Sequence, residues 1–213
     1  MALARNDAYK NYAKHQIYTI GHSNKTIEEF IALLQRYEIN VIVDVRSNPY
    51  SRYVSQFNQK PLQRALYEHD IKYIFMGNEL GGQPKDNRFY DDKGYVLYYA
   101  IASEPSFEAG IERLKKGLQE EFNDSIMCSE ENPHDCHRRL LVSRVLIEHG
   151  ISISHIRANG NLQTEADDFI EAHSEQLSFY ESGASSTWKS MQPVLQEKQQ
   201  QNPSARLRKT GSN

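Results

Sequence analysis

The sequence predicts an α/β protein with about five mainly parallel strands and helices on both faces of the sheet, a Rossmann-like three-layer sandwich. Three observations favour this fold class. Short segments rich in β-branched residues alternate with segments of helical periodicity. Residues 40–45 form a continuous apolar run, typical of a strand buried on both faces of a parallel sheet. With 213 residues, the chain has the length of one domain with an extension.

The elements follow one another in a regular order. A capping box at residues 26–29 opens the first helix, Pro61 and Pro105 stand in first turns, and Gly150 follows a helix end. A long loop is expected at residues 77–94. Strands are expected at residues 16–20, 40–45, 71–75, 124–128 and 151–156. Helices are expected after the capping box and at residues 61–69, 105–118, 137–149 and 164–179.

The composition divides the chain into three parts. We expect an N-terminal extension at residues 1–15, a single α/β domain at 16–181 and a flexible basic tail at 182–213. The tail is rich in Ser, Gln, Lys and Arg, and such a segment cannot bury enough apolar surface to order itself. Its charge offers a weak electrostatic attraction for a polyanion, but a plain disordered terminus is the favoured interpretation.

Composition also excludes several classes of protein. Two cysteines are too few for a secreted disulfide scaffold, which favours a reducing compartment. A net charge of −3 gives no global field for recruiting nucleic acid or an anionic membrane. No run of 18 apolar residues is present, so no membrane partner is expected. The sequence therefore predicts a cytoplasmic protein.

Ionisable, polar and nucleophilic side chains follow the predicted strands, at the edge where open parallel sheets bind their ligands. Asp44 and Arg46 close an apolar strand, where burying a charge is costly unless the group is paired or functional. Both alternatives, a structural ion pair and a functional pair, stay open. Gly81 and Gly82 allow close approach to a ligand, or serve only a tight turn. The pair His22 and Ser23 follows the first strand, where a glycine turn and a helix cap are the simpler explanation.

The loop after the fourth strand carries the most information, because both cysteines lie in it. Cys136 precedes a helix start and stands beside His137 and Arg138, which favours a thiolate of lowered pKa facing an anion held by Arg138. A small buried cysteine is one alternative. The other is a zinc site with Cys128, Cys136 and His134 as ligands, or His137 in place of His134.

Four motifs in this order resemble domain-of-unknown-function family 488. They are YTIGHSN, VDVRSNPYSRY, NELGG and C-x-E-x-x-P-x-x-C-H-R, the last of which fits residues 128–138, and the resemblance covers about residues 17–157. It implies a small cytosolic bacterial α/β protein with a polar pocket, and it implies no reaction. The residues carried over by the family pattern are His22, Ser23, Asp44, Arg46, Pro49, Ser51, Arg52, Gly81, Gly82, Cys128, Glu130, Pro133, Cys136, His137 and Arg138.

The resulting hypothesis is an enzyme acting on a nucleotide, nucleoside or other phosphorylated small molecule. Its catalytic candidates are Cys136, Glu130, Asp44 and His22. Its candidate ligand-binding residues are Ser23, Arg46, Arg52, Gly81, Gly82, Cys128, His137 and Arg138. No cofactor is predicted unless the zinc alternative holds. The competing hypothesis is a non-catalytic nucleotide or nucleic-acid binding module that uses the same pocket, the basic tail and several tyrosines.

Overall fold

A computed structural model describes residues 16–120, 122–165 and 188–194. Its sheet has six strands in the order β3-β2-β4-β1-β5-β6, of which β6 alone runs antiparallel to its neighbour. The strands are β1 (Gln16–Gly21), β2 (Val41–Asp44), β3 (Lys72–Phe75), β4 (Asp124–Cys128), β5 (Ser152–Ile156) and β6 (Leu162–Thr164). The predicted α/β class and its five parallel strands are confirmed.

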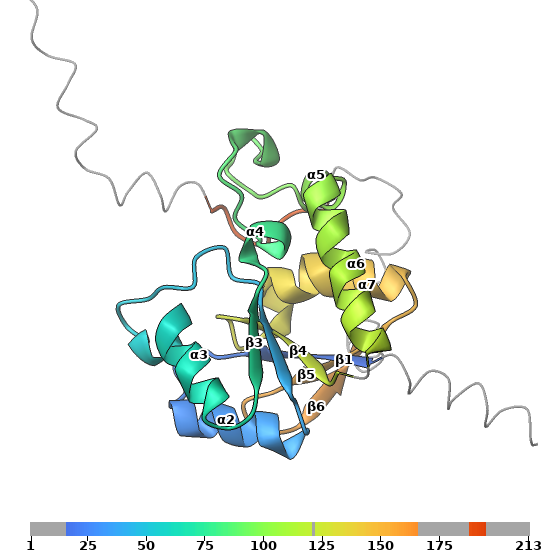
Figure 1. Ribbon diagram of the computed structural model, residues 1–213. Helices are drawn as coiled ribbons and strands as arrows, with labels where there is room; N and C mark the ends of the chain where they lie inside the picture. The colour runs from blue at the N-terminus through green and yellow to red at the C-terminus, as the bar shows by residue number, and fades with distance from the viewer. Residues whose placement is uncertain (1–15, 121, 166–187, 195–213) are drawn as a thin grey trace, which may run out of the picture.

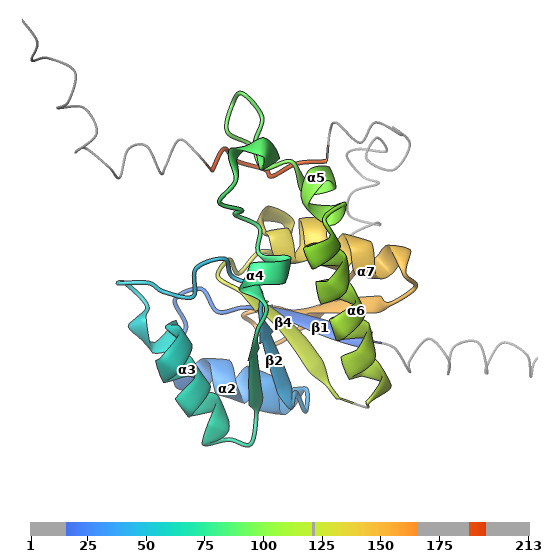
Figure 2. The same cartoon turned by 45° about the horizontal axis from the view of Figure 1, so that its top comes forward.

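Helices cover both faces of the sheet (Figures 1 and 2). The helices are α2 (Ile27–Arg36), α3 (Gln59–Tyr67), α4 (Gly77–Leu80), α5 (Tyr98–Ala102), α6 (Pro105–Gln119) and α7 (Arg144–Glu148). Short 3-10 turns occur at η1 (Ser55–Phe57), η2 (Asn87–Phe89) and η3 (Pro133–Asp135), and a π-helical turn, η4 (Arg138–Ser143), leads into α7. The three layers are those predicted, but the strand order differs from the 3-2-1-4-5-6 order of a Rossmann sheet.

The core consists of two apolar clusters, one on each face of the sheet. Helices α2 and α3 bury Phe30, Leu34 and Leu62 against Ile42 of β2. Helix α6 and the η4–α7 segment pack on the opposite face, where Val43 and Ile126 contribute from the sheet. Side chains of one strand thus enter both clusters, which explains why β2 reads as a continuous apolar run.

The predicted start of the first helix is reproduced in detail. The hydroxyl of Thr26 accepts a hydrogen bond from the Glu29 amide at 3.2 Å, and the Thr26 amide donates to the Glu29 carboxylate at 2.8 Å. This reciprocal capping box places the apolar residues of α2 toward the sheet.

Two regions differ from the expected elements, and two lie outside the described residues. The predicted loop 77–94 contains α4 and η2, with Leu80 and Phe89 buried. Strand β6 was not expected, and it includes Thr164, where a helix was predicted to begin. The rest of that predicted helix, residues 166–179, lies outside the described residues. The extension 1–15 also lies outside them.

Part of the expected tail lies against the domain. The indole N–H of Trp188 donates to the Leu140 carbonyl at 2.6 Å, and the Arg144 guanidinium lies 4.3 Å from the centre of the Trp188 ring. The Tyr98 amide donates to the Trp188 carbonyl at 3.0 Å. Residues 188–194 thus differ from a free tail, while the predicted domain boundaries stay a prediction.

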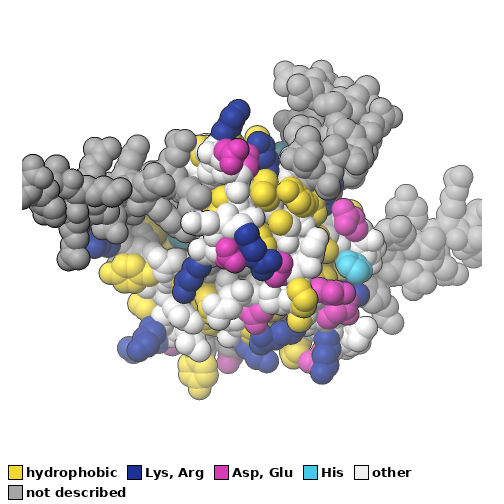
Figure 3. Space-filling view, turned by 90° about the horizontal axis from the view of Figure 1, so that it is seen from above, with side chains coloured by type: hydrophobic (Ala, Val, Ile, Leu, Met, Phe, Trp, Pro, Cys, Tyr) yellow, Lys and Arg dark blue, Asp and Glu magenta, His cyan; other side chains and the backbone are white. Residues whose placement is uncertain are grey.

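The molecular surface carries mixed charges. In Figure 3, Lys and Arg side chains are interspersed with Asp and Glu, in keeping with a net charge of −3. Within the part of the chain described, none of the helices has the length and apolar character needed to cross a bilayer.

One carboxylate in the sheet is poorly solvated. Asp124 opens β4, is 3% exposed, and its Oδ1 atom has no hydrogen-bond partner among the described residues. Burial raises the pKa of Asp124 from 3.8 to about 6, against a smaller opposing effect of the Lys72 charge. The ionised carboxylate therefore destabilises the folded state.

We predict that Asp124→Asn stabilises the protein at neutral pH. Because the pKa is about 6 in the folded chain and 3.8 in the reference state, wild-type stability falls as the pH rises between these values and stays lower above them. This shift corresponds to about 3 kcal/mol at most, so we expect a gain of about 1–2 kcal/mol at pH near 7.5 after discounting for solvent access. Urea unfolding of the wild type and of Asp124→Asn between about pH 4 and 7.5 measures the difference in their free energies of unfolding.

The control is Asp92→Asn at an exposed site, where we expect a change in the free energy of unfolding below about 0.5 kcal/mol. An Asp124→Asn protein with the wild-type fall in stability between pH 4 and 6 would contradict the assignment of that fall to Asp124.

Candidate functional site

Three loops meet at the carboxyl ends of the central strands. Strand β4 lies between β1 and β2, so the residues that follow these three strands are neighbours in space. The amides of His22 and Ser23 donate to the carbonyls of Cys128 and Ser129 at 3.0 and 2.8 Å. After β1 and β2 the chain turns into α2 and α3 on one face, whereas after β4 it turns into the η4–α7 segment on the other. Such a divergence of connections opens a crevice at the strand ends.

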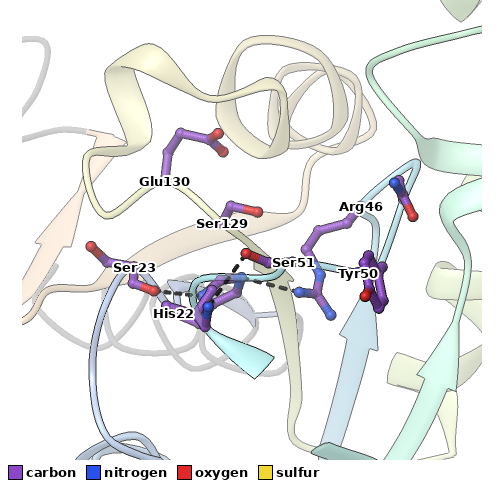
Figure 4. Close-up of a pocket in the computed structure, with 9 residues that line it drawn as sticks. His22, Ser23, Arg46, Tyr50, Ser51, Ser129 and Glu130 are labelled. Atoms are coloured by element: carbon purple, nitrogen blue, oxygen red, sulfur yellow. Dashed lines mark hydrogen bonds between the residues drawn. The ribbon is translucent and has the colours of Figure 1, made fainter. Parts of the chain in front are cut away.

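A pocket of about 240 Å³ occupies this crevice. Figure 4 shows Glu130 and the pair of His22 and Arg46 on different parts of its wall. The pocket is lined by His22, Ser23, Arg46, Asn48, Tyr50, Ser51, Val54, Ser129 and Glu130. It therefore combines an acid, an imidazole and a guanidinium with several hydroxyl groups.

Asp44 holds Arg46 in the pocket wall. The buried Asp44 carboxylate accepts hydrogen bonds from Nε and Nη2 of Arg46 at 2.9 and 2.6 Å, and from the Tyr73 hydroxyl at 2.7 Å. Burial opposes the charged form of Arg46, but the hydrogen bond and charge of Asp44 outweigh it and raise the pKa of the guanidinium. The two residues thus form an ion pair, in which Arg46 lines the pocket and Asp44 lies behind it.

His22 is a neutral imidazole in this arrangement. Arg46 Nη1 lies 3.1 Å from Nε2 of His22, so Nε2 is the acceptor and Nδ1–H donates to the Ser23 carbonyl at 2.8 Å. Burial lowers the pKa of His22 to about 4. The ring stacks on Phe57 with centroids 4.4 Å apart, and the Phe57 carbonyl accepts a hydrogen bond from Arg46 Nη2 at 2.8 Å. Both ring nitrogens of His22 are thus engaged by the protein.

Both cysteines lie behind Glu130. The Sγ atoms of Cys128 and Cys136 are 3.2 and 3.3 Å from Oε2 of Glu130, and Cys128 Sγ is 3.6 Å from Nδ1 of His137. Ligand atoms of Cys128, Cys136 and His137 lie within 4.8 Å of one another, so this triad could hold a metal ion. The sequence left two candidates open for the histidine ligand, His134 and His137, and only His137 belongs to this triad. Instead, His134 lies next to Gln163, with 3.3 Å between their Nε2 atoms.

The two thiols differ in acidity. Burial alone would raise the pKa of Cys136, but the hydrogen bond from Cys128 and the charge of Arg138, together with His137, lower it well below the usual range. The hydrogen bond with Cys136 and burial raise the pKa of Cys128. Burial and the neighbouring Cys136 raise the pKa of Glu130. The direction for Cys136 agrees with the sequence prediction, but Cys136 is only 1% exposed and does not line the pocket.

Arg138 does not face the pocket, contrary to the prediction that it holds an anion. It is fully buried, and its Nη1 and Nη2 atoms donate to the backbone carbonyls of Glu130 and Glu131, the latter at 2.7 Å. Its Nε atom donates to the Thr19 hydroxyl at 3.3 Å. Arg138 is therefore a positioning residue for the loop that carries Glu130.

A family model described as "Domain of unknown function DUF488" matches residues 26–145. The chain belongs to the DUF488 family. The family match confirms the resemblance, although it is shorter than the expected span of 17–157 and begins after His22 and Ser23. No curated protein and no solved structure matches the chain.

The structure brings together most of the predicted site residues of this DUF488 protein, in two groups. The residues that line the pocket are His22, Ser23, Arg46 and Glu130, and those in the adjoining cluster are Cys128, Cys136 and His137. Arg52 is exposed and outside the pocket lining. The two glycines pack against protein atoms: a Cβ on Gly82 would lie 2.4 Å from the His137 ring, and one on Gly81 would lie 2.3 Å from the Gly77 carbonyl oxygen.

Three lining residues were not singled out from the sequence: Asn48, Val54 and Ser129. Ser129 directly follows β4 and Asn48 lies in the segment after β2, so their position beyond the strand ends was a usable signal. Val54 lies further along the loop, and its apolar side chain carries no such signal.

We predict that Arg138→Lys destabilises the protein by about 2–4 kcal/mol, because lysine cannot serve two carbonyls and a hydroxyl from one buried position. The matched control is Arg64→Lys, at an exposed ion pair with Glu68, where we expect a change below about 0.5 kcal/mol. Chemical denaturation at constant pH measures both. Equally small losses of unfolding free energy in the two variants would show that the loop does not depend on the hydrogen bonds of the Arg138 guanidinium.

Proposed function

We propose that this DUF488 protein is an enzyme acting on a nucleotide, nucleoside or other phosphorylated small molecule bound in the pocket after β1, β2 and β4. The observation that carries the proposal is the shared pocket wall of Glu130, Arg46 and His22, which come from three different loops. Convergence of a carboxyl group, an imidazole and a guanidinium on one cavity is typical of catalytic sites.

The size of the pocket supports a sugar or phosphate group as its occupant. At about 240 Å³ it is smaller than the roughly 300–1,000 Å³ typical of pockets that enclose drug-sized ligands. The hydroxyls of Ser23, Ser51 and Ser129 suit the polar atoms of a ribose. A base would then lie outside, where the Tyr50 ring is 63% exposed.

The charge of the pocket supports a ligand with few negative charges. Arg46 is the only cation among the lining residues of the described chain, and its guanidinium is already paired with Asp44. A polyphosphate would meet little compensating charge there. We therefore favour a nucleoside, a nucleoside monophosphate or a sugar phosphate.

Glu130 is the acid or base candidate on geometric grounds. It is the only carboxylate among the described lining residues. The Nε2 atom of His22 accepts from Arg46, which leaves His22 to orient rather than to transfer protons. Nucleophilic attack by Cys136, the earlier expectation, would require Glu130 to move aside, and it stays a prediction.

The non-catalytic alternative has less support. Tyr90 and Tyr98 are buried, so these two rings offer no face for stacked bases. The charges on the face in Figure 3 are interspersed. The predicted basic segment lies mostly outside the described residues, and a cytoplasmic location stays a prediction. Nucleic-acid binding that weakens steeply with salt would support this alternative.

We predict that Tyr50→Ala weakens binding of nucleosides and nucleoside monophosphates by about 5- to 150-fold, the range of one lost base-stacking contact. Tyr53→Ala is the matched control, because Tyr53 is 97% exposed and does not line the pocket. Isothermal titration calorimetry with a panel of nucleosides, nucleotides and sugar phosphates measures both variants. Equal losses in the two variants, or no binding by any compound, would contradict the ligand class.

For a ligand that binds, mass spectrometry after long incubation tests turnover. Glu130→Gln should retain binding and slow product formation by about 100-fold or more. Binding without product in the wild type would show a non-catalytic module.

A further inference from the structure

We propose that Cys128, Cys136 and His137 bind one zinc ion, with the fourth coordination position facing Glu130 and the pocket. The proposal concerns the cluster behind the pocket, which the assignment of Glu130, Arg46 and His22 leaves unused. Of the two histidines that the sequence offered for this site, the proposal uses His137.

The spacing of the ligand atoms suits zinc. Sulfur and nitrogen ligands at about 2.3 and 2.0 Å from a tetrahedral zinc ion lie about 3.5 Å apart. The distance between Cys128 Sγ and His137 Nδ1 is 3.6 Å, and all three ligand atoms lie within 4.8 Å of one another. Two cysteines and a histidine are a donor set that prefers zinc to magnesium or calcium.

The orientation of His137 is fixed as in a metal ligand. Its Nε2 atom lies 3.0 Å from the Val45 carbonyl oxygen, which can only accept, so Nε2 carries the proton. In the neutral ring, the Nδ1 lone pair is then directed at the cysteines. Metal-bound histidines almost always donate their other ring N–H in this way. Gly82 packs closely against His137, because any Cβ there would overlap the ring.

Charge supports the same conclusion. Both cysteines are buried, and a divalent zinc ion would neutralise the two thiolates that ligate it.

Glu130 connects the cluster to the pocket. Its Oε2 atom touches both sulfurs, and the same side chain lines the pocket. Three protein ligands with an open fourth position are characteristic of catalytic rather than structural zinc sites. A Lewis acid at this place would act next to the ligand, a consequence that rests on the proposed function, whereas zinc binding itself does not.

Metal titration of the full chain tests the proposal. We expect about one zinc per chain by elemental analysis, and a thiolate-to-cobalt charge-transfer band with tetrahedral d–d bands when Co²⁺ is added to the metal-free, reduced protein. Cys128→Ser, Cys136→Ser and His137→Gln should each weaken zinc binding by at least about 100-fold. His134→Gln is the matched control and should bind zinc like the wild type.

Glu130→Gln distinguishes an open site from a closed one. Retained zinc affinity, within about 10-fold, is expected if three residues are the ligands. A loss as large as that of His137→Gln would make Glu130 the fourth ligand and overturn the open position. A folded, reduced wild type without the cobalt charge-transfer band, or a chain isolated with a Cys128–Cys136 disulfide and no metal, would overturn the whole site.

These readouts need no ligand for the pocket. Failure of zinc binding would leave the nucleotide and nucleoside titrations of Tyr50→Ala and Tyr53→Ala unaffected. Failure of those titrations would in turn leave the zinc measurement standing.

Discussion

The buried guanidinium of Arg138 is the constraint on which the site depends. A charged group with no solvent exposure costs several kcal/mol unless the protein replaces its water. The replacement comes from the carbonyls of Glu130 and Glu131 and from the Thr19 hydroxyl, so the loop after β4 must bend toward the centre of the sheet. The Glu130 carbonyl then lies so close to Gly21 that a Cβ there would be 1.8 Å from its oxygen. The buried charge of Arg138 thus fixes the position of the loop and of Glu130, and it requires a glycine at position 21 of β1.

The bend places Glu130 between two regions of different chemistry, the pocket and the cluster of Cys128, Cys136 and His137. On the pocket side, Asp44, Arg46 and His22 form a chain of hydrogen bonds in which every charge is paired. On the other side, the two thiols lie beside the Glu130 carboxyl and His137, and the charge of Arg138 acts on Cys136. This side has no ion pair like that of Asp44 and Arg46 among the described residues, so a bound metal would change its electrostatics strongly.

The sequence predicts the fold and the location of the site better than the roles of its charged residues. Apolar runs and caps predict the parallel strands and α2, and the strand ends indicate where polar groups converge. Strand β6 is missed because it is short, antiparallel and half exposed, and thus has no apolar run. His134 and His137 are chemically identical in sequence. Only the backbone separates them, since His134 lies in a 3-10 turn and His137 caps the π-helical turn.

Three basic residues follow Cys136: His137, Arg138 and Arg139. Such a run at a helix start suggests an anion site, but in the structure these side chains bind other parts of the protein. Successive side chains at a helix start point in different directions. His137 is directed at the Val45 carbonyl after β2, Arg138 at the loop after β4 and at Thr19 of β1, and Arg139 forms a two-bond ion pair with Glu165 after β6. Each basic residue therefore ties the same helix start to a different strand of the sheet. In this protein the run acts first as a clamp, and its positive charge reaches the site mainly through its effect on Cys136.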